Sequence, residues 1–268
     1  MNETVSALVV HIHSTEFDRS GEHVNQMVYD LERQGMHAAD KVIAVSHLTK
    51  NIVVNRYAIP EEKVEVVYNA IDRENGVVGF VNPGISKDEK IVLFLGRITM
   101  QKGPEYFLAA AKKVLEVMDN VKFVMAGSGD MIRRTIEMAA EMGIGHKVLF
   151  TGFLRGKDVD RIFQMADLFV MPSVSEPFGL VPLEALRNDV PVIISKQSGV
   201  AEVLTHALKV DFWDIHEMAN KIVAVLRHPP LHSTLREHGN FEVRKFNWTT
   251  SAQQIMDVYR MVQMPVAV

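Results

Sequence analysis

Residues 91–104 read IVLFLGRITMQKGP: an apolar run, then a glycine, two separated cations and a proline. The run Ile91–Leu95 has the length and the β-branched content of a buried strand. Pro104 suits the first turn of a helix, where its missing N–H removes no hydrogen bond. The stretch therefore predicts a strand, a loop carrying Arg97 and Lys102, and a helix, in that order.

Short apolar runs of the same kind recur after residue 88, and amphipathic helical segments lie between them. Strands so apolar are buried on both faces, which is typical of a parallel sheet covered by helices on both sides. We therefore expect an α/β fold with a doubly wound parallel sheet, in which ligands bind beyond the carboxyl ends of the strands. The predicted strands are Ile91–Leu95, Lys122–Ala126, Val148–Thr151, Leu168–Met171, Val192–Ser195 and Ala207–Val210.

The part of the chain before residue 72 has a similar but shorter pattern. It predicts a βαβαβ region with helices near residues 24–37 and at His47–Tyr57. Residues 73–88 contain glycines and a proline with little periodicity, which indicates a linker. The three strands predicted for this region are Val5–Ile12, Lys41–Ser46 and Lys63–Asn69.

The end of the chain has the apolar spacing of an amphipathic helix. Thr249 or Thr250 is the expected cap of that helix. Together these patterns divide the chain into an N-terminal α/β region at 1–72, the linker at 73–88, a complete Rossmann-like domain at 89–245 and a terminal helix and tail at 246–268.

The composition of the 268 residues is that of an ordinary globular protein, with 47% apolar and 23% charged residues. A net charge of −4 gives no general attraction to nucleic acid, so we expect no nucleic-acid partner. The sequence contains no cysteine, which removes disulfides and thiol chemistry and fits a cytoplasmic location. No signal peptide is recognisable, and charges interrupt every apolar run before the ~18 residues that a membrane span needs.

The segment Gly96–Gly103 places two different cations just before a predicted helix. The guanidinium of Arg97 offers paired donors, and the ammonium of Lys102 is a mobile point charge. Free N–H groups at a helix start add to the same positive potential. This combination suits a diphosphate. The alternative, that both are solvated loop cations, stays open on these eight residues alone.

A second polar segment follows the predicted strand Leu168–Met171 and carries Glu176 and Glu184, eight positions apart. Gly179 permits close backbone approach, and the N–H groups near Gly179 and Leu180 would face the same anion as the two cations. The alternative makes Glu184 a helix-start carboxylate and Glu176 a surface acid. Two acids and a glycine at fixed spacing after a strand favour a ligand site over this alternative.

With these residues in place, the sequence resembles the group 1, glycogen-synthase-like glycosyltransferases of the retaining GT-B type. The spacing from Glu176 to Glu184 looks like the E-x7-E motif of that family, and Gly96–Gly103 looks like its G-R-x4-K-G motif. The resemblance implies a GT-B-type α/β fold with one complete Rossmann-like domain and a partial N-terminal α/β domain. Further similar segments lie at residues 39–46, 69–72, 126–129 and 151–153.

The resemblance also implies a nucleotide-sugar donor site in the second domain. By this analogy Arg97 and Lys102 bind the diphosphate. Glu184 would bind the ribose hydroxyls, and Glu176 would face the donor sugar. We expect no metal and no cofactor besides the nucleotide-sugar co-substrate, ADP- or UDP-linked. The other donor-binding positions that the resemblance implies are Gly96, Gly127, Gly152, Phe153, Leu154, Phe178, Gly179 and Leu180, although simple turn chemistry explains the glycine turn at Gly127 equally well.

A histidine near the start of the chain is the remaining catalytic candidate. In the family that the sequence resembles, a strand of the first domain ends in a histidine that reaches toward the donor, and His13 occupies that place. Alternation along a strand puts His11 and His13 on one face, so spacing alone does not separate them. A structural histidine is an open alternative. A metal pair is disfavoured because it lacks a clear third ligand.

Two further sequence patterns resemble functional motifs but give weaker evidence for a site. Asp158 and Asp160 match the D-x-D pattern of metal-dependent glycosyltransferases, but they stand at the start of a predicted helix, where acids are ordinary. The segment Ser198–Glu202 resembles the family's glycine–glutamate segment, with Ser198 where a second glycine is common. That difference leaves the local backbone and the role of Glu202 open.

The function implied is sugar transfer from a nucleoside-diphosphate sugar to a carbohydrate acceptor, with retention of configuration. Same-face attack, with the departing phosphate taking the acceptor proton, needs no protein nucleophile. Two alternatives remain: a non-catalytic nucleotide-sugar-binding module, and a GT-B-fold nucleotide-sugar epimerase. The residues expected to take part in the chemistry are His13, Glu176, Arg97 and Lys102.

The N-terminal region is short for this family, whose first domain has roughly 150 to 200 residues. We therefore expect a chain truncated on the acceptor side that carries mainly the donor-binding portion. An open strand edge beside Val5–Ile12 and an uncovered apolar face on the C-terminal helix would favour self-association.

Overall fold

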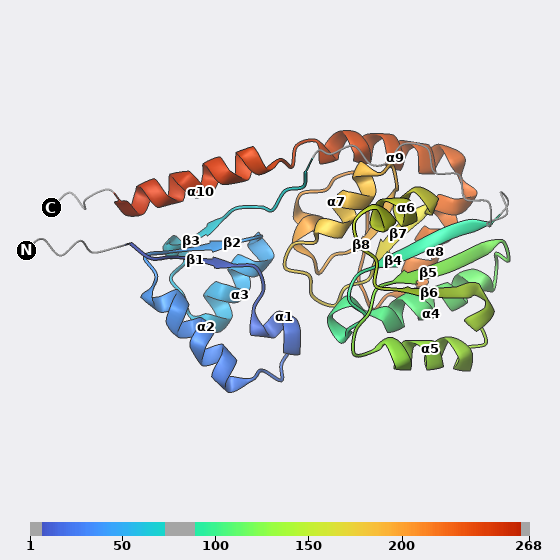
Figure 1. Ribbon diagram of the computed structural model, residues 1–268, viewed down its shortest axis with the longest axis horizontal. Coiled ribbons are helices and arrows are strands. Elements are labelled where there is room, and N and C mark those ends of the chain that lie inside the picture. The colour runs from blue at the N-terminus through green and yellow to red at the C-terminus, as the bar shows by residue number, and fades with distance from the viewer. Residues whose placement is uncertain (1–6, 73–88, 264–268) are drawn as a thin grey trace, which may run out of the picture. The chain divides into compact units, whose positions relative to one another are not determined.

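The chain folds into two compact units, seen in a computed structural model that describes residues 7–72 and 89–263 (Figure 1). The first unit combines the N-terminal 72 residues with the segment from Phe246 onward. The second unit runs from Arg73 to Lys245. The chain therefore leaves the first unit, forms the second, and returns to the first.

The first unit is built on a three-stranded parallel sheet in the order β1-β2-β3. Its strands are β1 (Val9–Ile12), β2 (Lys41–Ala44) and β3 (Val64–Val66). Its helices are α1 (Glu16–Ser20), α2 (Gln26–Ala38), α3 (His47–Tyr57) and α10 (Trp248–Gln263).

Alternation along β2 divides its side chains between two small cores. Val42 and Ala44 are buried in the core to which α2 and α3 contribute. Ile43 points to the other face and is buried with Val258 of α10. The sheet is therefore covered by helices on both faces.

The cover that we expected α10 to lack is present. Its Val258 is 4% exposed, and the Ser251 hydroxyl donates to the Tyr68 carbonyl at 2.8 Å. The predicted threonine cap is also wrong, because the side chain of Asn247 accepts the N–H of Thr250 at 3.0 Å. An asparagine fits this place because its side-chain oxygen reaches the free N–H groups of the first turn.

Two strands of the first unit are shorter than the sequence pattern predicts. Strand β2 ends at Ala44 because Ser46 already caps α3 through its hydroxyl. Strand β3 begins at Val64 because a 3-10 turn occupies Glu61–Lys63. The predicted start of the first strand, at Val5, lies outside the described residues.

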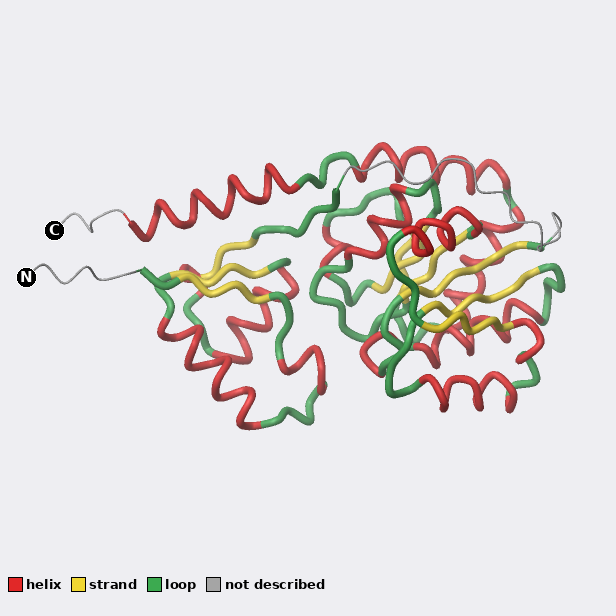
Figure 2. Tube along the Cα trace, viewed as in Figure 1, coloured by secondary structure: helices red, strands yellow, loops and turns green. Residues whose placement is uncertain are grey.

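The second unit is built on a six-stranded parallel sheet in the order β6-β5-β4-β7-β8-β9. Figure 2 shows its strands in yellow among red helices. Every strand predicted for this region is present, and each predicted bound agrees with the structure to within one residue. The strands are β4 (Lys90–Leu95), β5 (Val121–Ala126), β6 (Val148–Gly152), β7 (Leu168–Met171), β8 (Val192–Ser195) and β9 (Leu208–Val210).

Helices cover both faces of this sheet, as a doubly wound fold requires (Figure 1). One face carries α4 (Pro104–Leu115), α5 (Ile132–Glu141) and α8 (Ile215–Arg227), which share one large core with the strands. The other carries α6 (Lys157–Met165) and α7 (Leu180–Arg187), with α9 (Pro229–Val243) against α7. Among the helices of residues 7–72 and 89–263, none combines the length and apolar character needed to span a bilayer.

The strand order marks one place in the sheet as special. From β4 the chain winds outward through β5 and β6, then crosses back to β7 and winds outward the other way through β8 and β9. Strands β4 and β7 are neighbours, with Val92 opposite Leu168 and Leu93 opposite Phe169. The loops after these two strands therefore diverge, and in open α/β sheets such a switch point is where ligands bind.

Candidate functional site

The loop after β4 holds its two cations differently. Arg97 is exposed, and the bond described for it goes to the side-chain oxygen of Gln101 at 3.5 Å, with no ion pair among the described residues. Gln101 is itself buried, and its carbonyl accepts the N–H of Val174 at 2.9 Å. Val174 belongs to the loop after β7, so Gln101 ties the two switch-point loops together.

Two glycines after β5 fix the position of the loop after β4. A Cβ atom on Gly127 would lie 1.8 Å from the Gly96 carbonyl oxygen, and one on Gly129 would lie 2.2 Å from that of Ile98. The N–H of Ile98 donates to the Ser128 carbonyl at 2.9 Å. Backbone lies directly against backbone here, which only glycine allows. This contact is a packing reason for the glycine turn noted in the sequence.

A third glycine brings the start of α4 against the loop after β7. Gly103 has a φ of +64°, and a Cβ atom there would lie 2.3 Å from the Pro172 carbonyl oxygen. Pro104 opens α4 directly after it, as the sequence predicts. The turn that carries Lys102 therefore lies directly against the loop after β7, with Gly103 next to the Pro172 carbonyl.

Lys102 and Glu176 form an ion pair across the switch point. Their side chains are 19% and 10% exposed, which excludes the alternative that Glu176 is a surface acid. The Ser173 hydroxyl donates to the same carboxylate at 3.4 Å. The backbone of Glu176 is fixed as well: its N–H donates to the Gln197 carbonyl at 3.0 Å, and its carbonyl accepts the N–H of Gly199 at 2.9 Å.

The N-terminus of α7 lies next to this pair. Gly179 precedes the helix with a φ of +103°, and no side chain caps the helix start. A Cβ atom on Gly179 would lie a tight 3.2 Å from Cγ of Glu176, and the positive φ favours glycine at this position. Phe178 is buried at 2% exposure, and its carbonyl accepts the N–H of Val200 at 2.7 Å.

Glu184 lies further along α7 and is half-buried. Burial raises the pKa of the Glu184 carboxyl, the neighbouring Arg187 acts to lower it, and Asp160 acts to raise it. Arg187 and Asp160 are themselves in contact, with Nη2 and Oδ1 3.4 Å apart. Glu184 is thus a partly desolvated acid beside an ion pair that joins α6 to α7.

The two acids of the D-x-D pattern lie in the first turn of α6. Asp158 pairs with Arg161 at 2.9 Å, and Asp160 pairs with Arg187. In the described ranges no three histidine, aspartate or glutamate side chains come together in a way that would hold a metal ion.

The loop after β6 carries an exposed aromatic ring. Phe153 is 63% exposed, and the guanidinium of Arg155 lies 4.9 Å from the centre of its ring. Gly152 has a φ of +74°, and its carbonyl accepts the N–H of Gly127 at 2.8 Å. Leu154 is half-buried. The loops after β5 and β6 are therefore joined by a backbone hydrogen bond. The exposed Phe153 ring has one face available for stacking.

The serine that replaces a common glycine does not distort the backbone. Ser198 has an extended conformation, with φ −136° and ψ 141°, which any residue adopts. Its hydroxyl donates to the Ser195 carbonyl at 2.6 Å, and its backbone pairs with that of Glu176. The segment after β8 therefore supports Glu176 through its main chain.

In the first unit, His11 in β1 and His13 just after it have different surroundings. His11 is half-buried, and its Nε2 atom lies 3.2 Å from the Tyr259 hydroxyl. Burial lowers the pKa of His11, and the nearby His13 lowers it further. His13 follows the last residue of β1 and is exposed. His11 is thus part of the contact with α10, whereas His13 is accessible.

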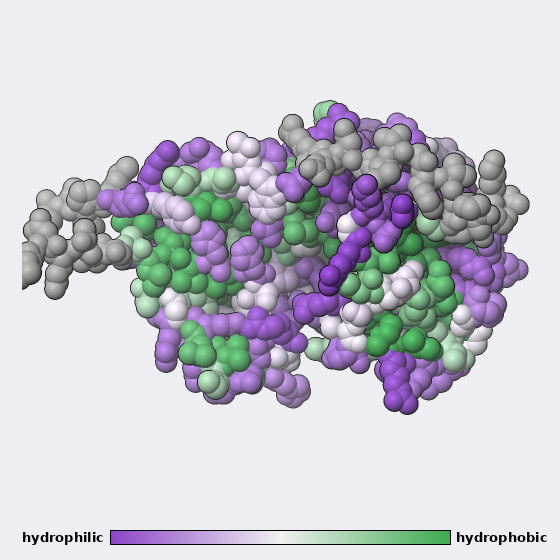
Figure 3. All heavy atoms as spheres, in the orientation of Figure 1, coloured by the Kyte–Doolittle hydropathy of each residue, from purple (hydrophilic) through white to green (hydrophobic). Residues whose placement is uncertain are grey.

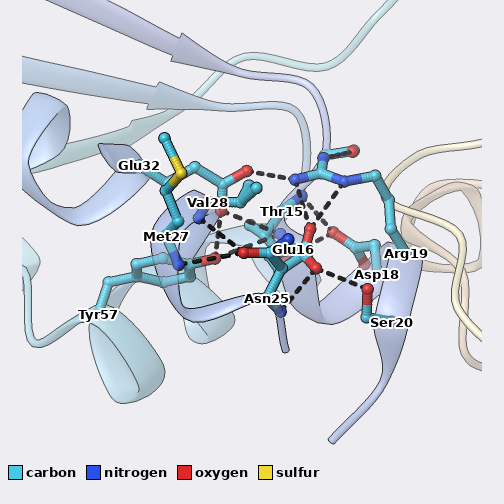
Figure 4. A network of polar contacts seen from close by, with 11 residues as sticks. Thr15, Glu16, Asp18, Arg19, Ser20, Asn25, Met27, Val28, Glu32 and Tyr57 are labelled. Atoms are coloured by element: carbon cyan, nitrogen blue, oxygen red, sulfur yellow. Dashed lines mark hydrogen bonds and ion pairs between the residues drawn. The ribbon is translucent and has the colours of Figure 1, made fainter. Parts of the chain in front are cut away.

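The residues that follow His13 are held by a polar network (Figure 4). Arg19 donates to the Ser14 hydroxyl at 2.8 Å, to Glu16 at 3.2 Å and to Glu32 at 2.5 Å. Glu16 accepts bonds from the Ser20 hydroxyl and the Asn25 N–H. Arg19, Glu16 and Glu32 therefore link the loop after β1 to α2.

The network ends on α3 and centres on a helix that the sequence pattern did not reveal. Tyr57 of α3 donates to Glu32 at 2.5 Å, and burial together with that carboxylate raises the pKa of Tyr57. Helix α1 has five residues, too few for periodicity to show. The available signal was local: the Asp18 carboxylate accepts the N–H of Thr15 at 2.7 Å, a helix-start pairing with three-residue spacing.

Comparison with known families matches both parts of the chain. The profile described as "Glycosyl transferases group 1" matches residues 80–240, and that described as "Glycosyltransferase Family 4" matches residues 4–75. An uncharacterized glycosyltransferase of Methanocaldococcus jannaschii is 33% identical over 267 residues, covering 93% of this chain and 68% of that protein. A D-inositol 3-phosphate glycosyltransferase of Mycolicibacterium smegmatis is 30% identical over 238 residues, covering 85% and 54%. The chain spans about half the length of several such relatives.

Solved structures have the same architecture. Sucrose-phosphate synthase from Thermosynechococcus elongatus matches with a TM-score of 0.80 and 25% identity, covering 94% of this chain and 67% of that one. Anabaena HepE, in complex with UDP and glucose, matches with a TM-score of 0.82 and 21% identity, covering 95% and 71%. Two parallel sheets with helices on both faces are the GT-B arrangement. The chain therefore belongs to the group 1 glycosyltransferases and has their GT-B-type α/β fold.

Proposed function

We propose that this chain binds the nucleoside-diphosphate part of a sugar donor and serves in retaining, metal-independent sugar transfer. One observation carries the proposal: the loops after β4 and β7, at the switch point, present Arg97, Lys102 and Glu176 beside the uncapped start of α7. The structural neighbour HepE holds UDP and UDP-glucose, which supports a nucleotide sugar as the ligand class.

The charges suit the departure of a diphosphate. As the bond to the sugar breaks, negative charge grows on the phosphate and positive charge grows at the anomeric carbon. Arg97, Lys102 and the N–H groups at the start of α7 stabilise the former without a metal ion. In same-face attack the departing phosphate takes the acceptor proton, so the protein supplies no nucleophile.

The remaining donor contacts follow the chemistry of each position. We assign the ribose hydroxyls to Glu184, because a carboxylate accepts two hydroxyl hydrogen bonds. The base is assigned to the exposed ring of Phe153 and the adjoining Gly152 and Leu154, because aromatic faces stack on flat bases. The main-chain N–H groups at Gly179 and Leu180 are assigned to phosphate or sugar oxygens.

For the first unit we propose His13 as the catalytic residue, with a carbohydrate as the acceptor. Its accessibility after β1 supports this choice over His11, which contacts Tyr259. In a transfer assay His13→Ala should lower kcat by about 100-fold or more, the usual loss when one hydrogen-bonding group is removed from a transition state. Nucleotide affinity should not change. A variant with normal turnover would return His13 to a structural residue.

Calorimetry with ADP, UDP and GDP in the presence of a chelator tests the proposed function. We expect at least one of them to bind with a Kd between about 1 µM and 1 mM, the range of ordinary substrate sites. No heat with any of the three at millimolar concentration would remove the donor-site assignment. Binding without turnover would instead support a nucleotide-sugar-binding module.

We also propose that the first unit self-associates. Within the described residues β1 pairs on one side only, with β2. Leu8, Met27 and Leu31 are 46%, 72% and 60% exposed, and apolar surface gathers over the sheet and at the lower end of α2 (Figure 3). Light scattering should give a mass above that of one chain, and a single-chain mass at all concentrations would contradict this.

A further inference from the structure

The ion pair between Lys102 and Glu176 lies where the proposed function places a diphosphate, so its role as inferred below depends on that function. Among the described lysine ion pairs it is the one in which both side chains are less than 20% exposed. The other lysine pairs have at least one partner in open contact with water. Lys102 is thus charge-compensated before any ligand arrives.

The backbone positions of both partners are held by neighbouring segments. On one side, Gly103 lies against the Pro172 carbonyl and fixes the turn that carries Lys102. On the other side, main-chain bonds to the segment after β8 hold Glu176. Gly179 packs closely on the Glu176 side chain, where a Cβ atom would lie 3.2 Å from Cγ of Glu176. The carboxylate therefore stays within reach of the ammonium.

This arrangement makes the two cations unequal toward an incoming anion. Arg97 is exposed with an amide oxygen as its described partner, so a phosphate gains its full attraction. Lys102 must first exchange its carboxylate for the phosphate. Glu176 would then remain in a partly buried place without its cation and close to a second anion, which is unfavourable.

The cost depends on what else the ligand brings. A bare diphosphate offers Glu176 nothing in exchange for Lys102. A donor sugar carries hydroxyl groups, which can donate to the released carboxylate. Specificity is a difference between two affinities, and a group that opposes one ligand creates it as effectively as a group that attracts the other.

We propose that Glu176 is the resident anion of Lys102, and that it weakens binding of the bare nucleoside diphosphate so that the site favours the intact donor over the departing product. Glu176 is in this sense a specificity-determining residue of the donor site. Product release is assisted because the carboxylate returns to the ammonium as the diphosphate leaves.

The test is calorimetry on Glu176→Gln, which keeps the shape and the hydrogen-bonding oxygen but removes the charge. Inorganic pyrophosphate and the tightest of ADP, UDP and GDP should bind about fivefold more tightly than to the wild type, in line with the modest energy of a partly exposed ion pair. The glucose-linked form of the same nucleotide should gain less than twofold or lose affinity. The dissociation constant of the nucleoside diphosphate, divided by that of its glucose-linked form, should therefore fall.

Two matched variants separate this effect from others. Glu116→Gln changes the net charge equally and breaks the exposed pair with Lys113 at the far end of α4, so it should leave all affinities unchanged. Glu176→Asp keeps the anion, and it should show no gain for pyrophosphate. A gain in either variant would mean that overall charge or side-chain volume, not the pairing, controls binding.

The outcomes also distinguish this proposal from the proposed function. If the wild type binds a nucleoside diphosphate and Glu176→Gln binds it equally or less well, the resident-anion role is wrong and the donor site stands. If Glu176→Gln gains affinity equally for the nucleoside diphosphate and the nucleotide sugar, Glu176 does not discriminate between product and donor. If the wild type binds none of the probes, both proposals fall.

Discussion

The loop after β1 and the loop after β4 both follow the end of a parallel strand, yet their arginines are held in opposite ways. After β1, Arg19 bonds to two carboxylates and a hydroxyl, and the same carboxylates take further donors. After β4, Arg97 is exposed and has only an amide oxygen as its described partner. A polar network that is satisfied within the protein gives rigidity. A cation without a carboxylate keeps its capacity for an external anion, so the saturation of the charges, more than their number, separates a structural cluster from a binding site.

Removing Glu16 should break the saturated network and have the largest effect on stability. Glu16→Ala leaves Arg19 short of a partner and orphans the Ser20 and Asn25 donors, at a cost of about 3 kcal/mol in unfolding free energy. Hydrogen bonds from Ser20 and Asn25 lower the pKa of Glu16, so this contribution should be present above the ordinary carboxylate pKa and lost as the pH falls through the lowered value.

Each unit can be followed separately because each holds one of the two tryptophans, Trp248 in the first and Trp213 in the second. Variants with a single tryptophan, unfolded in urea, should show a lower midpoint for Glu16→Ala at Trp248. The midpoint at Trp213 should stay where it is. Equal shifts at both reporters would mean that the network stabilises the whole chain rather than its own unit.

Removing Arg97 should have the next largest effect, and on binding rather than stability. Arg97→Ala should weaken nucleoside-diphosphate binding by about 1.5–3 kcal/mol, the range for hydrogen bonds to charged groups. Arg97→Lys should restore only part of this, because a point charge does not reproduce the guanidinium fork. Arg133→Ala, at an exposed arginine of α5, is the control in the same calorimetric titration. Equal affinity in Arg97→Ala and the control would make Arg97 a solvated loop cation.

Glu184 is intermediate between the paired charges after β1 and the exposed Arg97. It is partly buried, and the nearby Asp160 opposes its ionisation. Glu184→Gln should lower nucleotide affinity by about 1 kcal/mol, the value of one hydrogen bond, and leave inorganic pyrophosphate affinity unchanged. Equal losses for both ligands would refute the ribose assignment.

The same variant should be more stable than the wild type at neutral pH. The raised pKa of Glu184 means that the folded state holds a proton more firmly than the unfolded state, so its unfavourable contribution grows as the pH rises above the ordinary carboxylate value. Melting temperatures measured at pH 4 and pH 7 should therefore differ between variant and wild type only at the higher pH. A variant that melts lower at pH 7 would contradict this.

The smallest effect is expected at the D-x-D pattern, whose charges are saturated like those after β1. Asp158→Asn removes an exposed pair with Arg161 and should change the unfolding free energy by less than about 0.5 kcal/mol. Added chelator should leave nucleotide affinity unchanged. A loss of binding in chelator that Mg²⁺ restores would show that a metal ion takes part after all.

The sheet of the second unit was predictable because the evidence for it is local. Strands β7 and β8 are buried at every position and apolar at every position but Ser195, and their predicted bounds are those of the structure. Helix α1 is not predictable because five residues show no period, and the cap of α10 is Asn247 rather than the threonines that follow Trp248. Local patterns thus predict long elements well and short elements or exact caps poorly.

The site was predictable in part for a related reason. Rules for parallel sheets bring residues after strands to one edge, so Arg97, Lys102 and Glu176 were named together. Their pairing was not foreseen, because it depends on which strands are neighbours, and the alternation of strands and helices does not reveal that β4 lies beside β7. The packing of Gly127 on Gly96 depends on the same neighbour relations.

The return of α10 to the first unit has a consequence for synthesis on the ribosome. Ser251 and Tyr68, which join α10 to the first sheet, are 183 positions apart. At the usual elongation rates that interval lasts on the order of ten to forty seconds. The second unit is contiguous and can complete its core during this time, while one face of the first sheet waits uncovered. The unit translated first is therefore finished last, and nascent chains in this interval are the form most in need of a chaperone.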